Sequence, residues 1–195
     1  FETSRLNPAG AVFDRQKLKW MNSVYLRKMS NADLWNAIQP HLNDAGLKFD
    51  HSGMTADEVR IWQERSVEIF KTSMEILSDA VPLYKTLSDE KFKITEESAE
   101  ALAWESTKNV FTEWIGLLKT SNKKYLSEEE FLKLQDDVKN KTGAKGKFLF
   151  MSVRVAVIGK PHGTELKILV PLIKVSSLIS RGENALAHVL NLNKI

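Results

Sequence analysis

The chain has 195 residues, of which 43% are hydrophobic and 27% are charged, a balance that is ordinary for a soluble globular protein. No apolar run approaches the length of a membrane span, and the absence of cysteine excludes disulfides and thiolate chemistry. We therefore expect a cytoplasmic protein with one sizeable domain or two small ones. The chain begins Phe1-Glu2-Thr3 without a methionine, and we interpret it as part of a longer protein.

Basic residues are concentrated toward the end of the chain. From residue 138 onward, ten Lys and Arg residues are opposed only by Glu165 and Glu183, so this part carries a net charge of +8, whereas residues 1–137 carry −5. Charge asymmetry of this kind is typical of a nucleic-acid-binding segment. A solvated basic face without a partner is the alternative, and charge alone does not separate the two.

Capping-box spacing predicts three helix starts, at Ser30 to Asp33, Thr55 to Glu58 and Ser127 to Glu130. After Thr55, apolar residues recur at helical spacing as far as Val81, which predicts one long amphipathic helix. Pro82 interrupts this pattern and is expected to end the helix. The break near Pro82 is also the best domain boundary in the chain.

Two further helical segments follow, one from Thr95 to Leu118 and one from Ser127 to a stop at Gly143. Residues 148–158 are the exception, because their β-branched residues favour a strand. Periodicity cannot assign so short an apolar run. The rest of the chain predicts an all-α protein.

No catalytic or metal-binding constellation is found in the sequence. Its four histidines lack ligand spacing, and without cysteine a zinc site is not expected. The tripeptide Lys28-Met29-Ser30 matches the start of the K-M-S-K-S loop of class I aminoacyl-tRNA synthetases. The second lysine of that loop is missing, so we interpret the match as coincidental and Ser30 as a helix cap.

Two stretches carry a more specific resemblance. Phe13-Asp14-Arg15-Gln16-Lys17-Leu18-Lys19-Trp20-Met21-Asn22, followed by Tyr25-Leu26-Arg27, resembles the post-catalytic segment of bacterial-type glutamyl-tRNA synthetases. That family's K-G-K…L-F-M-P-L-R-x-A-L-T-G…H-G-P-E-L signature resembles Lys145-Gly146-Lys147, Leu149-Phe150-Met151, Val153-Arg154-Val155-Ala156 and His162-Gly163-Thr164-Glu165-Leu166. Both stretches lie in the family's order, and the resemblance covers essentially the whole chain.

The resemblance implies two helical-bundle domains in tandem that bind the anticodon. Residues 1–84 would form the first, with an N-terminal tail from the stem-contact region, and residues 85–195 would form the second. The intact enzyme would use ATP and Mg²⁺ to attach glutamate to tRNA-Glu through a glutamyl-adenylate. ATP and glutamate would bind a catalytic domain outside this chain, which alone should be an inactive monomer without a catalytic residue, metal or cofactor.

The same resemblance implies the site residues. The run from Phe148 to Gly159 would be a helix, and Arg154 would occupy the arginine of the P-L-R motif that faces the anticodon bases. Gly163, Thr164 and Leu166 would supply backbone and apolar contacts, which suits unpaired bases that can also stack on a guanidinium plane. Sequence-independent attraction to phosphates would come from Lys145, Lys147 and Lys160.

One position departs from the family pattern. Many members carry an arginine in an E-R-V-K-T-L-like helix, which reads the third anticodon base and separates tRNA-Glu from tRNA-Gln. Ile69 occupies that position here, and isoleucine cannot donate a hydrogen bond to a cytosine edge. Loss of one polar base contact is worth roughly 1–3 kcal/mol, or ten- to hundredfold. We hypothesise that the enzyme discriminates weakly and also charges tRNA-Gln.

Two rival interpretations stay open on the sequence alone. One is a free-standing helical RNA-binding protein, and the other is a helical scaffold whose basic face only confers solubility. The scaffold predicts no tRNA binding at moderate salt and no loss of binding when Arg154 is changed to alanine.

Overall fold

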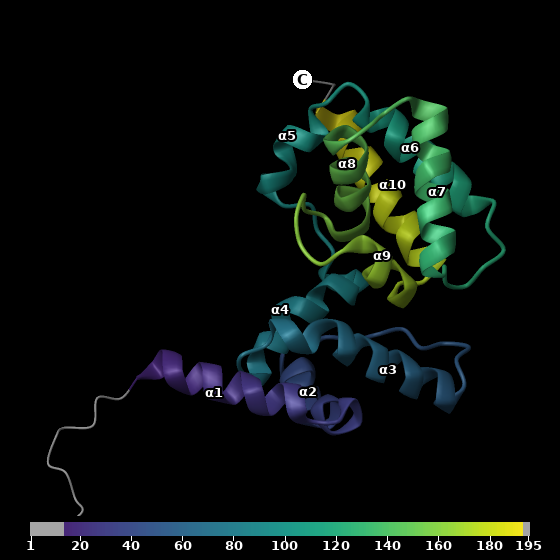
Figure 1. Cartoon of the computed structure of the whole chain (residues 1–195). Coiled ribbons are helices and arrows are strands. Elements are labelled where there is room, and N and C mark those ends of the chain that lie inside the picture. The colour runs from purple at the N-terminus through teal and green to yellow at the C-terminus, as the bar shows by residue number, and fades with distance from the viewer. Residues whose placement is uncertain (1–13, 193–195) are drawn as a thin grey trace, which may run out of the picture.

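The computed structural model describes residues 14–192, so the predicted N-terminal tail and Phe13 of the N-terminal motif lie outside the described residues. These residues form helices in two groups, one above the other in Figure 1, and within them no strand occurs. Tyr125 and Lys174 form only an isolated antiparallel bridge. The all-α prediction is confirmed.

The first group holds the helices at the bottom of Figure 1. Its elements are α1 (Arg15–Lys28), α2 (Asn31–Asp44), α3 (Ala56–Phe70), the 3₁₀ turns Lys71–Ser73 and Leu77–Asp79, and α4 (Ala80–Tyr84). α2 packs against both α3 and α4. Its core is aromatic: the Trp35 and Trp62 rings meet edge to face at 6.1 Å, and the buried Tyr84 hydroxyl shares a 2.8 Å hydrogen bond with Ser66.

The second group contains the remaining helices. They are α5 (Ala99–Leu102), α6 (Thr107–Lys119), α7 (Glu128–Thr142), α8 (Lys147–Ile158), α9 (Leu166–Leu169) and α10 (Val175–Leu192), with 3₁₀ turns at Lys85–Leu87, Asp89–Lys91, Glu96–Ser98 and Val170–Leu172. α6 lies at the centre and packs against α7, α8 and α10. One face of α6 is fully buried, through Val110, Phe111, Trp114 and Leu118.

The predicted helix starts are confirmed by their hydrogen bonds. Ser30 Oγ accepts from the amide of Asp33, and complete capping boxes join Thr55 with Glu58 and Ser127 with Glu130. Gly143, with φ of 71°, ends α7 as predicted. In each case the signal acts within one helical turn, which explains why the sequence alone predicts it.

The predicted long helix from Thr55 to Val81 is wrong, because α3 ends at Phe70. The carboxylate of Asp79 accepts from the backbone amides of Glu75 and Ile76, at 2.8 and 3.0 Å. These bonds stabilise the 3₁₀ turn Leu77–Asp79, which leads directly into α4. Pro82 lies within α4 instead of ending a helix, at the third position of its first turn. The predicted segment from Thr95 to Leu118 is likewise two helices, α5 and α6.

The run from Phe148 to Gly159 is helical, as the resemblance implied, and its strand propensity is overridden by packing. α8 buries Leu149, Val153, Val155 and Val157 in the second group. It ends at Gly159, where φ is 74° and an added Cβ would come within 2.1 Å of the Lys93 carbonyl oxygen. That close approach fixes the start of the loop that leads to α9.

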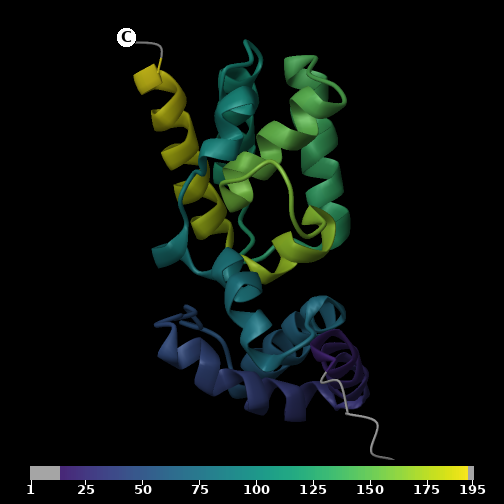
Figure 2. The same cartoon turned by 90° about the vertical axis from the view of Figure 1, so that its left-hand side faces the viewer.

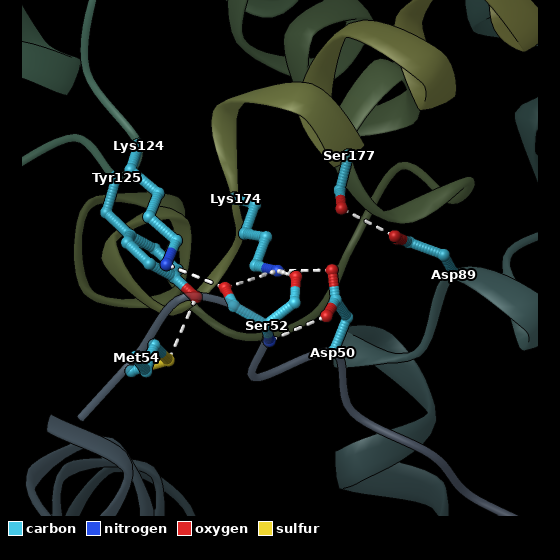
Figure 3. A network of polar contacts seen from close by, with 8 residues as sticks. All are labelled: Asp50, Ser52, Met54, Asp89, Lys124, Tyr125, Lys174 and Ser177. Carbon is cyan, nitrogen blue, oxygen red and sulfur yellow. Dashed lines mark hydrogen bonds and ion pairs between the residues drawn. The ribbon is translucent and has the colours of Figure 1, made fainter. Parts of the chain in front are cut away.

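A polar network joins the two groups (Figure 3). The ammonium of Lys174, in the second group, pairs with Asp50 and donates to the Ser52 hydroxyl at 2.9 Å. Lys124 donates to the Ser52 carbonyl at 2.8 Å. Beneath the network, the Trp62 indole donates to the Leu172 carbonyl at 2.9 Å, and this bond is buried. Both polar and buried contacts therefore hold the groups together.

The chain connection between the groups runs through α4 and the turn Lys85–Leu87 that directly continues it (Figure 2). The boundary between residues 84 and 85 falls inside this continuous run and stays a prediction. None of the helices between residues 14 and 192 is both long and apolar enough to cross a bilayer.

Candidate nucleic-acid interface

Arg154 lies in the middle of α8 and its side chain is half-buried. Its Nη1 donates to the carbonyl oxygens of Gly163 and Thr164, at 3.1 and 2.7 Å. Burial lowers the pKa of the guanidinium, which stays charged because arginine does not deprotonate in proteins. One side chain thus ties the loop after α8 back onto α8, and its Nε and Nη2 donors bond no other described residue.

Two of the predicted site residues lie on that loop, and a third directly follows it. Gly163 is exposed, with φ of 140°, and Thr164 is half-buried. Leu166 begins α9 and is only 5% exposed. It therefore offers little of the apolar surface that the resemblance implied. The structure brings these three residues together with Arg154.

A hollow of about 300 Å³ lies between α7, α8 and the start of α9. Its lining includes Leu132, Gln135, Phe150, Arg154, Glu165, Leu166 and Lys167. Phe150 is 52% exposed and Leu132 44% exposed, although both belong to helices with a buried face. Apolar surface beside a cation and an amide matches the contacts that an unpaired base makes with protein. We name this feature the Arg154 hollow.

Sequence reasoning missed Phe150, Leu132 and Gln135. Helical spacing could have indicated which residues share a face. Phe150 precedes Arg154 by one turn of α8, and Leu132 precedes Gln135 by one turn of α7. What the sequence could not supply was the packing of α7 beside α8 and α9 that brings these faces together.

The predicted phosphate contacts differ in their surroundings. Lys145 is exposed, and Lys160 is half-buried beside the loop. Lys147 forms an ion pair with Glu100 at 3.2 Å and lies over the Trp104 ring at 5.2 Å. Part of its charge is therefore already compensated, and it lies two helical turns from Arg154.

Ile69 lies apart from the other predicted residues, on α3 of the first group. Its side chain is half-buried and packs against the core. It therefore supplies apolar packing at the position where the resemblance implied a base contact.

Within residues 14–192, no cluster of three or more His, Asp or Glu side chains gathers that could hold a metal ion. Any chemistry that needs Mg²⁺ and ATP is not assigned to these residues.

Two helical groups, a basic C-terminal part and an arginine held beside exposed aromatic surface are the features expected of a helical RNA-binding module. Comparison with known families places the module more closely: the family described as "Anticodon binding domain" matches residues 24–186. The chain belongs to this family. The resemblance to the anticodon-binding region of bacterial-type glutamyl-tRNA synthetases is confirmed by the relatives that follow.

Curated relatives that match most of the chain carry the name glutamate–tRNA ligase. The protein of Bdellovibrio bacteriovorus is 54% identical over 189 residues, which are 97% of this chain and 37% of that protein. That of Geobacillus stearothermophilus is 32% identical over 187 residues, which cover 95% and 37% of the two chains. This chain therefore spans a little over a third of the length of these relatives.

Solved structures share the fold. A glutamate tRNA ligase from Elizabethkingia meningosepticum, in complex with its amino acid, superimposes with a TM-score of 0.77 at 17% identity, over 97% of this chain and 35% of that one. Glutamate-tRNA synthetase from Elizabethkingia anophelis gives 0.72 at 18% identity, over 96% and 34%. At this level of identity the likeness supports the helical arrangement.

Proposed function

We propose that the chain is the anticodon-binding region of a glutamate–tRNA ligase and that it holds tRNA-Glu by its unpaired anticodon bases. The observation that carries the proposal is the Arg154 hollow, where a guanidinium fixed by two loop carbonyls lies beside exposed Phe150 and Leu132. Membership of the anticodon-binding family and the names of the relatives support the same function.

The chemistry of the hollow suits bases better than backbone. Phe150 and the guanidinium plane offer stacking surfaces, and the free Nε and Nη2 donors of Arg154 match the acceptor atoms on a base edge. Glu165, on the rim, accepts hydrogen bonds and repels phosphate. Phosphates would be attracted by Lys145 and Lys160 instead, with little regard to sequence.

Choice between tRNA-Glu and tRNA-Gln is a finer part of the proposal. Because Ile69 is apolar and packs against the core, α3 lacks a donor at the position where many family members carry an arginine. We retain the hypothesis that the enzyme accepts tRNA-Gln as well. An intact ligase that charges tRNA-Glu at least a hundredfold faster than tRNA-Gln would contradict it.

The activity of the longer protein follows as a further part of the proposal. Glutamate would be activated with ATP and Mg²⁺ in the part of the relatives' length that this chain does not span. The chain itself would act as a cytoplasmic monomer whose residues only bind and orient tRNA. The relatives' shared name supports this assignment.

The test is a binding titration of the 195-residue chain against tRNA-Glu, tRNA-Gln and an unrelated tRNA, at two salt concentrations. We expect tight binding to tRNA-Glu, tRNA-Gln close behind, and far weaker binding to the third. Equal binding to all three that vanishes as salt rises would show that the chain attracts RNA only through its positive charge, and it would overturn the proposal.

Arg154→Ala provides the matched variant. Loss of the stacking plane and its donors should weaken tRNA-Glu binding by about 1–3 kcal/mol, or ten- to hundredfold. Arg154→Lys keeps the charge without the plane and should rescue only part of the affinity. The control is Arg60→Ala, because Arg60 is an exposed arginine already paired with Asp57 and Glu64. Unchanged affinity in the Arg154 variants would remove the hollow from the proposal.

A further inference from the structure

A second hollow lies at the junction of the two helical groups, outside every site assigned above. It measures about 290 Å³ and opens between α3 and the segments around residues 124 and 171. We call it the junction groove, and the residues that the argument uses are Met54, Ile61, Arg65, Lys124, Pro171 and Leu172. Its size suits one planar base, since pockets for larger ligands begin at about this volume.

Two cations lie on the rim of the junction groove. Arg65 is exposed, and within residues 14–192 it takes part in no ion pair or side-chain hydrogen bond. By contrast, Arg60 on the same helix pairs with Asp57 at 3.4 Å and with Glu64 at 3.2 Å. The Lys124 ammonium has three N–H donors. One donates to the Ser52 carbonyl at 2.8 Å, and the other two remain for a ligand.

One carboxylate, Glu58, also lines the junction groove and would repel an anion. Its charge is engaged at the start of α3, where Glu58 accepts from the Thr55 amide at 2.6 Å. This hydrogen bond lowers the pKa of Glu58, and the positive end of the helix dipole offsets part of its charge. The rim therefore keeps an excess of positive charge where Arg65 and Lys124 lie.

The walls between these cations are apolar. Ile61 is 56% exposed and Met54 is half-buried, so these two side chains offer most of the apolar surface, whereas Pro171 and Leu172 are buried at its base. The Trp62 indole donor is already used by the Leu172 carbonyl. The walls can thus hold a flat ring without reading which base it is.

The junction groove and the Arg154 hollow are lined by the two ends of one short segment, residues 166–172. Leu166 and Lys167 line the hollow, and Pro171 and Leu172 line the groove. Only about 6–8 Å of helix separates Lys167 from Pro171. In Figure 1, α9 lies between α8 and α7 above and the first group below. This short segment is what a strand bound in both the hollow and the groove would have to cross.

We infer that the junction groove is a second nucleotide site, which takes one unpaired nucleotide of the same tRNA strand that fills the Arg154 hollow. Arg65 and Lys124 hold its phosphate, and its base lies against Ile61 and Met54. Because both helical groups line the groove, this nucleotide also bridges them. The inference rests on the proposed function, since it needs a bound tRNA.

Arg65→Ala tests the inference in the 195-residue chain, with a tRNA-Glu transcript as the probe. Loss of one charge-assisted contact should weaken binding about tenfold and lower the slope of log K against log salt by about one. Arg60→Ala, on the same helix, is the control and should bind as the unchanged chain does. Ile61→Asp should also weaken binding, whereas Ile76→Asp, at a 38% exposed isoleucine outside the groove, should not.

The outcomes separate this inference from the function on which it rests. If Arg154→Ala weakens binding while Arg65→Ala and Ile61→Asp bind as their controls do, the proposed function survives and the groove is not a nucleotide site. If Arg154→Ala binds tRNA-Glu normally, the proposed function fails and the inference fails with it. Weakening by Arg65→Ala without a change in salt slope would overturn the phosphate contact.

Discussion

The guanidinium of Arg154 donates from Nη1 to two carbonyls of one loop, and this leaves its plane and its other donors directed by the protein before any ligand arrives. A side chain held in this way loses little rotamer freedom on binding. The loop gains equally, because Gly163 and Thr164 are fixed against α8. Arg154 therefore positions both its own guanidinium and the loop of Gly163 and Thr164 at the proposed base-reading surface.

That organisation depends on Gly159, where the loop begins. Its φ of 74° is unfavourable for residues with a side chain, and a Cβ there would come within 2.1 Å of the Lys93 carbonyl oxygen. We expect Gly159→Ala to lower the free energy of unfolding by about 3 kcal/mol or more, measured by urea denaturation. Displacement of the loop should also weaken tRNA binding.

Gly143→Ala is the control for this substitution. Gly143 has nearly the same φ, 71°, but no atom lies within 4 Å of the position that its Cβ would take. Only the conformational cost remains, about 1 kcal/mol. If the two variants lost equal stability, the close approach to Lys93 would not be what requires glycine at position 159.

The candidate site was only partly predictable at the level of single residues. The motif placed Arg154 beside Gly163 and Thr164 because all three lie within one contiguous stretch. Phe150 and Leu132 were not predicted, since their exposure depends on how α7 and α8 pack together. Ile69 was predicted from the family resemblance, and only the structure shows that its side chain packs against the core.

Among the elements, α10 carries Arg181, which joins the end of α8 to the segment that follows α4. This side chain is 2% exposed, and its Nη1 donates to the carbonyls of Val157 and Thr86, both at 2.9 Å. Its Nε donates to Asp89 at 2.8 Å. One residue thus contacts the end of α8 and both 3₁₀ turns that follow α4.

Arg181→Met should therefore be strongly destabilising. The two carbonyls would lose their donor and Asp89 its partner, which should lower the free energy of unfolding by about 3 kcal/mol in urea denaturation. Asp89→Asn keeps the carbonyl contacts and a side-chain oxygen but leaves the buried guanidinium without its counter-charge, so a smaller loss than that of Arg181→Met is expected. An Arg181→Met protein as stable as the unchanged chain would show that these bonds add nothing net.

Elements with short-range signals were predictable, and those with long-range causes were not. The capping boxes at Thr55 and Ser127 act within one turn, and the sequence predicted both. The break after Phe70 depends on Asp79 reaching back to amides that precede it, which apolar periodicity does not reveal. Helix 147–158 reads as a strand by propensity, and only the family resemblance implied its helical state.

At the scale of the whole molecule, the relation between the two groups decides whether one RNA strand can contact both. The network in Figure 3 joins residues far apart in the sequence, chiefly Asp50 and Ser52 with Lys174. No local pattern predicts such a junction. Its chemistry makes the coupling dependent on pH, because Asp50 is the carboxylate that pairs with Lys174.

The hydrogen bonds from Lys174 and Ser52 hold the pKa of Asp50 well below its usual range. An unfolded aspartate titrates near 3.9, so the stability that Asp50 contributes is fully present above about pH 5. Below about pH 4 it is progressively lost, as the pH falls toward the folded-state pKa. The free energy of unfolding of Asp50→Asn should therefore be lower than that of the unchanged chain, by an amount that is constant between pH 5 and 7. Toward pH 3 this difference should shrink.

Urea denaturation at several pH values between 3 and 7 measures that difference. Asp136→Asn is the control, because Asp136 makes only an exposed pair with Lys139, at 3.6 Å, on the surface of α7. It should give a small difference at every pH. A pH-independent difference for Asp50→Asn would mean that the carboxylate charge does not hold the junction. The two groups, and with them the junction groove, would then depend on buried contacts such as that of Trp62 with Leu172.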